Sequence, residues 1–244
     1  MLKRMLDIVI SFFGLLVLSP VLLPIIILIW MQDYHSPFYL APRMARGSGT
    51  FRMVKLRSMV ANADKTGVNS TSNDDRRITP VGKYIRKFKL DELMQLWNVL
   101  LGDMSLVGPR PQVAAGAALY TEEEKKLLTV RPGITDFASI VFSDEGDILE
   151  GAEDPDLLYN QIIRPWKSRL ALLCIQHQSV VLDLRIIWLT ALAILSRESA
   201  LQGVNKILLA WGVDDLLVRM AARQEPLLAY PPPGGSTVVT AGHQ

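Results

Sequence analysis

The sequence has 244 residues, long enough for one good-sized domain or two small ones, and a formal net charge of +2. This mildly basic balance gives no reason to expect a nucleic acid partner. Hydrophobic residues make up 50% of the chain, which is high for a soluble enzyme, so contact with a membrane is expected. The single cysteine, Cys174, excludes an internal disulfide and fits a reducing, cytosolic compartment. Its apolar neighbours indicate a buried small hydrophobe.

An apolar run over residues 8–30 predicts a membrane segment at the N-terminus. It is long enough to cross a hydrocarbon core of about 30 Å and too long for the core of a signal peptide. Pro20 and Pro24 each remove a backbone N–H and clash with the preceding turn, at a cost of about 3 kcal/mol in a regular helix. A helix broken near its middle can turn back.

Basic residues flank this run on both sides, with Lys3 and Arg4 before it and Arg43 and Arg46 after it. Such charges normally mark the cytoplasmic side of a membrane segment. A re-entrant hairpin that enters and leaves by the cytoplasmic leaflet places both flanks correctly, and Ser19 can bond carbonyls freed by Pro20. A kinked anchor that crosses once is the alternative.

Residues 36–89 are strongly basic, with twelve Lys or Arg against three acids. This imbalance favours contact with anionic headgroups, a polyanionic substrate, or both. Within it, residues 51–59 show partial alternation and predict a short strand that carries cations, Lys55 and Arg57 among them, on one side.

Residues 86–111 form the most informative stretch. The apolar positions from Leu93 to Leu101 recur at helical spacing, and Gly102 stands where a left-handed stop is usual. Asp91 and Glu92 occupy the first turn, where the helix dipole alone is sufficient reason for acids. A rigid turn, Gly108-Pro109-Arg110-Pro111, comes next and presents one guanidinium. Two carboxylates among so many cations make chemical sense if a metal ion and a phosphate ester are both held there.

The remaining segments give weaker signals. The acids of residues 122–124 predict a solvated, charge-paired face. Residues 170–195 predict an amphipathic helix that lies on the membrane or packs on the core, and residues 200–223 predict another. The proline-rich segment 231–235 and the residues after it predict a disordered tail.

Several of these elements together resemble the core signature of the bacterial sugar transferases, the monotopic phosphoglycosyl transferases that start glycan assembly on a polyprenol phosphate. The resemblance rests on fixed spacings, over Leu90-Asp91-Glu92-Leu93, Gln95-Leu96-Trp97-Asn98-Val99, Gly102-Asp103-Met104-Ser105 and Val107-Gly108-Pro109-Arg110-Pro111. It extends to Ser19-Pro20, Lys55-Leu56-Arg57-Ser58-Met59, Arg86 and Val130-Arg131-Pro132-Gly133-Ile134-Thr135. Where many members continue Gly-Trp-Ala-Gln-Val, this chain has Asp136-Phe137-Ala138-Ser139-Ile140. A different donor sugar and a branch with unaltered chemistry both fit that departure.

The resemblance implies an α/β fold, mainly helical with a short sheet. Residues 1–35 would form the re-entrant membrane hairpin (helix, break at Ser19-Pro20, helix), and residues 36–198 a cytosolic catalytic domain with interfacial amphipathic helices on the membrane surface. Residues 199–244 would form a C-terminal helix and the disordered tail. The expected location is the cytoplasmic leaflet of a bacterial inner membrane, and a homodimer is one state that the sequence leaves open.

The implied reaction moves a sugar-1-phosphate from a UDP-sugar to undecaprenyl phosphate and releases UMP. Asp91 would be the nucleophile, Glu92 its partner, and both would hold Mg²⁺ or Mn²⁺. Phosphate contacts would come from Lys55, Arg57, Arg86, Arg110 and Arg131, and the turns of the site from Gly108, Pro109, Pro111, Pro132 and Gly133. Two other classes stay open: a membrane-attached glycosyltransferase that moves only the sugar and releases UDP, and a non-catalytic basic scaffold on the membrane.

Overall fold

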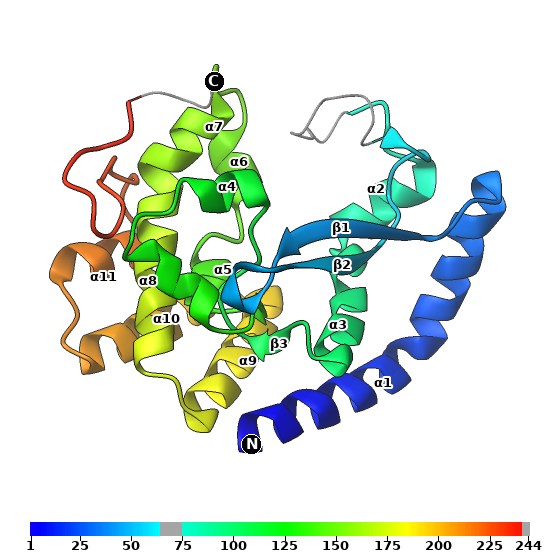
Figure 1. Ribbon diagram of the computed structural model, residues 1–244, viewed down its shortest axis with the longest axis horizontal. Helices are drawn as coiled ribbons and strands as arrows, with labels where there is room; N and C mark the ends of the chain where they lie inside the picture. The colour runs from blue at the N-terminus through cyan, green and yellow to red at the C-terminus, as the bar shows by residue number, and fades with distance from the viewer. Residues whose placement is uncertain (64–74, 241–244) are drawn as a thin grey trace. The chain divides into compact units, whose positions relative to one another are not determined.

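The computed structural model describes residues 1–63 and 75–240 (Figure 1). It is mainly helical with two short two-stranded sheets, which confirms the expected fold class at that level. The chain divides into two compact units. Unit 1 comprises residues 1–43 and 50–104, and unit 2 comprises residues 44–49 and 105–244. Each unit is described by itself.

Unit 1 contains one long helix and a small group of short elements. In chain order they are α1 (Leu2–Asp33), β1 (Phe38–Met44), β2 (Thr50–Leu56), α2 (Pro80–Lys87), the 3₁₀ helix η3 (Leu90–Met94) and α3 (Gln95–Leu101). Strands β1 and β2 pair as a two-stranded sheet. As the sequence predicts, α3 ends at Gly102 with a left-handed φ of 97°.

Helix α1 is continuous over 32 residues and contains both prolines. The break predicted at Ser19-Pro20 therefore does not interrupt it. The Ser19 hydroxyl donates to the Leu16 carbonyl at 2.7 Å, one turn back, as a serine beside a freed carbonyl can. Among the described residues, α1 is the one helix long and apolar enough to cross a membrane by length and composition.

One face of α1 packs along unit 1. Leu22 and Ile29 are buried with Leu56 and Ile85 in an apolar cluster. Near the N-terminus, Arg4 caps the end of α3 by donating to the carbonyls of Val99 at 2.5 Å and Leu100 at 2.8 Å. At the other end, Asp33 is ion-paired to Arg57. Both ends of α1 are therefore attached to the same unit.

The opposite face of α1 is apolar and exposed. Its side chains with about half or more of their surface accessible include Val9, Phe12, Phe13, Leu16, Val17, Val21, Leu23, Ile27 and Leu28. A contiguous apolar surface of this kind on a soluble protein marks an interaction site. The length and exposure of this face suggest association with a membrane.

Unit 2 is built from short elements around three longer helices. They are η1 (Arg46–Ser48), β3 (Ser105–Val107), α4 (Ala114–Ala118), η4 (Glu124–Thr129), β4 (Gly133–Thr135), α5 (Phe137–Val141), α6 (Glu145–Leu149), α7 (Pro155–Leu158), the π-helical turn η5 (Tyr159–Ile163), α8 (Arg164–Gln176), α9 (Val180–Leu195), α10 (Arg197–Ala210) and α11 (Asp215–Ala222). Trp166, Phe137 and Leu170 are fully buried in its core. Cys174 is also buried, and burial raises the pKa of its thiol well above the usual range, as expected of a packed hydrophobe.

Helix α9 carries an exposed apolar face. Val181, Leu184, Trp188 and Leu195 follow helical spacing and are between 47% and 86% exposed. The opposite face, with Leu182, Ile186 and Leu189, is buried. The predicted amphipathic pattern is thus present in α9, but the single helix predicted over residues 170–195 is wrong, because α8 ends at Gln176 and α9 begins at Val180. The helix predicted over residues 200–223 is likewise divided into α10 and α11.

The C-terminal segment from residue 224 to residue 240, which includes residues 231–240 of the predicted disordered tail, runs without helix or strand against α8 and η5 (Figure 1, red). Its carbonyls accept hydrogen bonds from side chains of the core: Leu228 from Trp166 at 2.9 Å, and Pro231 from Arg169 at 2.9 Å. The Trp166 and Tyr230 rings lie 4.7 Å apart. Prolines already fix much of this backbone, so ordering it against α8 costs little entropy.

Candidate active site

The predicted carboxylates, Asp91 and Glu92, lie on η3, directly ahead of α3. Lys89 precedes them with a left-handed φ of 52°, which is uncommon for a residue with a side chain. Both acids face the ammonium group of Lys55, whose Nζ lies 3.4 Å from an Asp91 oxygen and 3.9 Å from a Glu92 oxygen. The three side chains are between 18% and 25% exposed, so they are shielded from bulk water but accessible to a ligand.

Asn98 holds this cluster in place by bridging α3 and β2. Its amide oxygen accepts from the N–H of Val54 at 2.8 Å, and its amide nitrogen donates to the Arg52 carbonyl at 2.9 Å. Val54 directly precedes Lys55 on β2. Asn98 is a polar residue buried on a short, mainly apolar helix. Buried polar side chains are usually hydrogen-bonded, so its position among apolar residues could have indicated a structural role from the sequence.

Arg57 is not available to bind a phosphate, which corrects its predicted role. The side chain is 8% exposed. Its guanidinium forms a bidentate pair with Asp33, at 2.5 and 2.6 Å, and its Nε donates to the Ser36 carbonyl at 2.7 Å. The strand ends at Leu56, so Lys55 and Arg57 do not share one strand face. Arg57 instead fixes the chain where it leaves α1.

The predicted Arg86 lies in the last turn of α2 and is half-buried. Its charge, after the hydrogen bonds and charge of Arg77, helps hold the pKa of Asp75 at about 2. The structure therefore places Arg86 within electrostatic reach of Asp75.

In unit 2, the two predicted turns that contain Gly108 and Gly133 contact each other through these glycines. Strands β3 and β4 run parallel in the register Ser105↔Gly133 and Val107↔Thr135. Beyond them, the Gly108 N–H donates to the Thr135 carbonyl at 3.0 Å, and the Gly133 N–H donates to the Pro109 carbonyl at 2.9 Å. A Cβ on Gly133 would lie 2.1 Å from the Gly108 nitrogen, so only glycine fits.

This glycine pair fixes the positions of two predicted phosphate-binding arginines. Arg110 follows Gly108 by two residues and Arg131 precedes Gly133 by two, and both are exposed. The flanking Pro109 and Pro132 are buried, and Pro111 is half-buried. The rigid turns therefore present two guanidinium groups on a common backbone frame.

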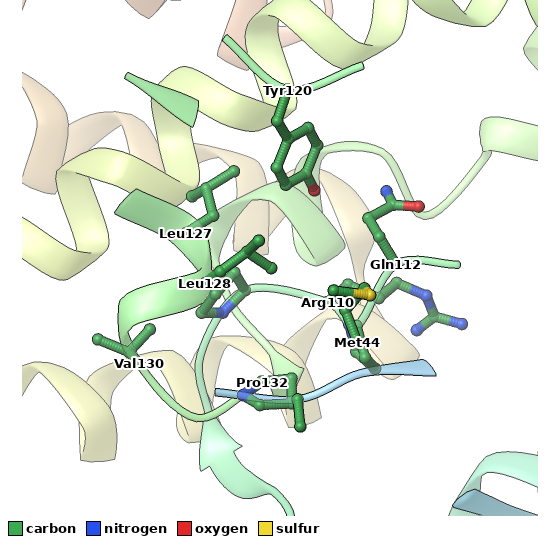
Figure 2. A pocket seen from close by; sticks show the side chains of 11 residues that line it. Met44, Arg110, Gln112, Tyr120, Leu127, Leu128, Val130 and Pro132 are labelled. Carbon is green, nitrogen blue, oxygen red and sulfur yellow. The ribbon is translucent and has the colours of Figure 1, made fainter. Parts of the chain in front are cut away.

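A small pocket lies beside these turns (Figure 2). Its walls are mainly apolar, from Met44, Pro109, Pro111, Leu127, Leu128, Val130 and Pro132. Figure 2 shows Leu127, Leu128 and Tyr120 on one side of it and Met44, Arg110 and Gln112 on the other. Gln112 is fixed because its amide donates to the Tyr159 hydroxyl at 3.2 Å.

Asp136, the first residue that departs from the common family pattern, is buried and caps α5. One of its oxygens accepts from the backbone N–H and the hydroxyl of Ser139, both at 2.7 Å. The other oxygen is buried without a hydrogen-bond partner among the described residues. Burial raises the pKa of this carboxyl above its usual range. In this chain Asp136 and Ser139 therefore serve as a helix cap.

The structure brings together Lys55, Asp91 and Glu92 in unit 1, and Gly108, Pro109, Pro132 and Gly133 in unit 2. Sequence reasoning missed Arg4 and Asn98, which hold the ends and the side of α3. The two carboxylates can share one cation, as their common contact with Lys55 shows. No group of three or more His, Cys, Asp or Glu suited to a metal occurs among the described residues, so an ion here would also need water or substrate oxygens.

Unit 1 thus carries a carboxylate pair that faces a lysine, and unit 2 carries rigid turns that bear two arginines. A family model described as bacterial sugar transferase matches residues 1–197. The chain therefore belongs to the bacterial sugar transferase family.

Three relatives illustrate the match. The Aeromonas hydrophila UDP-N-acetylgalactosamine-undecaprenyl-phosphate N-acetylgalactosaminephosphotransferase is 36% identical over 59% of this chain and 35% of its own length. The Komagataeibacter xylinus undecaprenyl-phosphate glucose phosphotransferase is 35% identical over 77% of this chain and 35% of its own length. The Rhizobium leguminosarum exopolysaccharide production protein PSS is 36% identical over 80% of this chain and 96% of its own length. The chain thus spans about a third of the first two relatives, whose names carry different sugars.

Proposed function

We propose that this protein transfers a sugar-1-phosphate from a UDP-sugar to undecaprenyl phosphate and releases UMP. The observation that carries the proposal is the pair Asp91 and Glu92, held on one turn beside Lys55 within the region that the family model matches. The printed names of the relatives, undecaprenyl-phosphate phosphotransferases, support the same reaction class.

In the first half-reaction a carboxylate oxygen of Asp91 attacks the phosphorus that bears the sugar. The bond from that phosphorus to the bridging oxygen breaks, and UMP leaves with the electron pair. The product is an aspartyl phosphosugar on the enzyme. Lys55 contacts the Asp91 carboxylate, so its charge can orient the nucleophile and offset repulsion between a carboxylate and a phosphate.

In the second half-reaction a phosphate oxygen of undecaprenyl phosphate attacks the same phosphorus. The acyl phosphate bond breaks, Asp91 is regenerated, and the lipid leaves as a diphosphate-linked sugar. Glu92 lies on the same turn and is assigned to hold Mg²⁺ with Asp91 or to orient the acceptor phosphate. Bound Mg²⁺ or Mn²⁺ would polarise phosphoryl oxygens. Two carboxylates suit such ions, which usually keep water and substrate phosphate as further ligands.

The phosphate charges are assigned to Arg86, Arg110 and Arg131 together with Lys55. Arg110 and Arg131 are exposed on rigid turns, so they can donate to phosphate oxygens without first ordering the backbone. Arg57 is left out of this set because Asp33 already occupies its guanidinium.

We further propose that α1 does not cross the inner membrane: both of its ends stay on the cytoplasmic side, its exposed apolar face lies in the cytoplasmic leaflet, and α9 lies in the interface. Support comes from Arg4 and Asp33, which attach the two ends of α1 to the same unit, so a straight crossing would have to break one attachment. Cysteines placed at Leu2 and His35, in a Cys174→Ser background, test this topology in inverted and right-side-out vesicles. Labelling of both positions from the cytoplasmic side alone is expected; labelling from opposite sides would establish a single crossing instead.

The reaction is tested by nucleotide release from a panel of UDP-sugars with purified protein, Mg²⁺ and undecaprenyl phosphate. With the acceptor lipid, continuous release of UMP is expected. Without the acceptor lipid, at most one equivalent of UMP per enzyme molecule is expected. Release of UDP would identify a glycosyltransferase that moves only the sugar. Absence of both nucleotides with every donor would favour the scaffold.

Replacing Arg110 distinguishes its charge from its shape. Arg110→Ala is expected to lower kcat/KM for UMP release by about 100-fold, and Arg110→Lys by about tenfold, because lysine keeps the charge but loses the forked pair of donors. Arg219→Ala on α11 is the matched control, since Arg219 is an exposed arginine of the same unit. Equal activity of Arg110→Ala and the control would remove Arg110 from the site.

A further inference from the structure

The outer face of α2 combines aromatic and basic side chains. Pro80, Lys83, Tyr84, Lys87 and Phe88 recur at helical spacing and are all exposed, with Tyr84 at 69% and Phe88 at 63%. The inner face, with Gly82 and Ile85, is buried. A Cβ on Gly82 would lie 1.9 Å from the Ser58 carbonyl oxygen, so this side of α2 is pressed against the chain and its orientation is fixed.

Positive charge predominates on α2 and the residues beside it, although Asp75 and Asp91 flank this stretch. Residues 76–90 contain six Lys or Arg and no acid. The Lys87 Nζ lies 5.7 Å from the centre of the Phe88 ring, so cation and aromatic surface occupy the same patch. Solvated helix faces usually mix both signs of charge and lack large exposed aromatics.

Helix α2 packs beside the C-terminal half of α1 through its inner face. Ile85 of α2 packs in the apolar cluster that contains Ile29 of α1. Trp30 and Tyr34, at the end of α1, are 48% and 72% exposed, and their rings are in contact with centres 5.1 Å apart. We term the exposed rings of Trp30, Tyr34, Tyr84 and Phe88, together with Lys83 and Lys87, the aromatic–basic rim of unit 1.

We propose that the aromatic–basic rim is a membrane-contact surface that rests in the headgroup layer of an anionic bilayer. Aromatic rings with a polar edge concentrate at the headgroup level, and lysines beside an anionic surface are attracted to lipid phosphates. The occupant is an anionic bilayer rather than a protein because the rim has complementary charge and belongs to the same unit as the exposed apolar face of α1. The inference rests on the proposed membrane attachment of α1 and places unit 1 at a defined depth.

Spin labels test the depth directly, since replacing Cys174 with serine leaves no other cysteine. Labels at Tyr84→Cys and Phe88→Cys are compared in nanodiscs containing anionic lipid with a label at Thr50→Cys, an exposed site at the far end of β2, about 20 Å along the strand from Leu56. The labels at 84 and 88 are expected to be more accessible to oxygen, which concentrates in the bilayer, than to a water-soluble nickel complex. The label at 50 is expected to be more accessible to the nickel complex. Water-like access at all three sites would overturn the proposal.

Two further measurements distinguish this proposal from membrane attachment by α1 alone and from nucleotide binding by the rim. A label at Phe13→Cys, on the exposed face of α1, reports the membrane attachment of α1 independently of the rim. Bilayer-like access at 13 with water-like access at 84 and 88 would overturn the rim proposal alone. Water-like access at 13 would also overturn the membrane attachment of α1. Immobilisation of the labels at 84 and 88 by uridine diphosphate in detergent would assign the rim to the nucleotide instead. Lys83→Gln with Lys87→Gln is expected to lower the equilibrium constant for engagement of the rim with the bilayer about 30-fold.

The rim also predicts how acceptor use depends on the bilayer. Tyr84→Ser with Phe88→Ser is expected to lower turnover about tenfold with undecaprenyl phosphate in nanodiscs and to leave turnover of a short-chain, detergent-soluble polyprenyl phosphate unchanged. Both side chains are mostly exposed, so their loss does not open the core. Equal losses with both acceptors would contradict a role confined to the membrane surface.

Discussion

Asp91→Asn is expected to reduce UMP release by roughly 10⁴-fold or more, by analogy with the removal of other enzyme nucleophiles. The amide keeps the size and the turn but cannot form the acyl phosphate that links the two half-reactions. The measurement is UMP release in a single-turnover assay, together with intact-mass analysis for a phosphosugar adduct. Wild-type protein given donor without acceptor is expected to gain the adduct, and the variant is not.

Asp215→Asn is the matched control, because Asp215 is an exposed aspartate in the first turn of α11 and its loss should leave both readouts unchanged. Glu92→Gln is expected to be severe in turnover but to retain some adduct, since Asp91 remains. Sustained UMP release by Asp91→Asn, after mass analysis has excluded deamidation back to aspartate, would eliminate the covalent route.

Local chemistry explains which features could be predicted. Helix α3 and its end at Gly102 could be predicted from the spacing of apolar residues and a left-handed glycine within a dozen residues. Strand β2 could be predicted from the alternation of apolar and polar side chains over seven residues. The carboxylates lie at the start of that helix, as expected, although the turn that holds them is a 3₁₀ helix. Such features depend on neighbours in sequence, so the sequence alone carries them.

Partner choice could not be predicted, because it depends on residues distant in sequence. Lys55 and Arg57 are two cations in one motif, yet Lys55 meets the carboxylates while Arg57 meets Asp33. Glu124 belongs to a run that predicts a solvated face, but it is fully buried in a pair with Arg164 and also accepts from Ser168 at 2.7 Å. In each case a buried partner outweighs the preference of a charged side chain for water.

The prolines of α1 show the same limit. A penalty of about 3 kcal/mol per proline predicts a break in an isolated helix. In unit 1, however, Leu22 and Ile25, on either side of Pro24, both contribute to the apolar cluster. Packing on both sides of the prolines favours continuation over a break, which the sequence pattern could not reveal.

The close contact between Gly108 and Gly133, 25 positions apart, gives the second large prediction. Gly133→Ala is expected to destabilise the protein by about 3 kcal/mol or more, because its Cβ would lie 2.1 Å from the Gly108 nitrogen and 2.4 Å from the Gly108 oxygen. These are backbone atoms that cannot rotate away. Neither glycine has a positive φ, so the cost is steric and not conformational. A loss of this size should lower Tm by about 10 °C in nanodiscs.

The order of effects makes this prediction specific. Gly108→Ala should cost less than Gly133→Ala, since its nearest contact is 2.6 Å from the Arg131 oxygen. Gly146→Ala is the matched control: it lies exposed on α6 with no atom within 4 Å of the added methyl, so Tm should hold or rise slightly. Because the glycine pair positions Arg110 and Arg131, UMP release should fall in the same order. Full stability and activity of Gly133→Ala would mean that the two turns are not in contact, and the arginines would then lack the shared frame on which their proposed role depends.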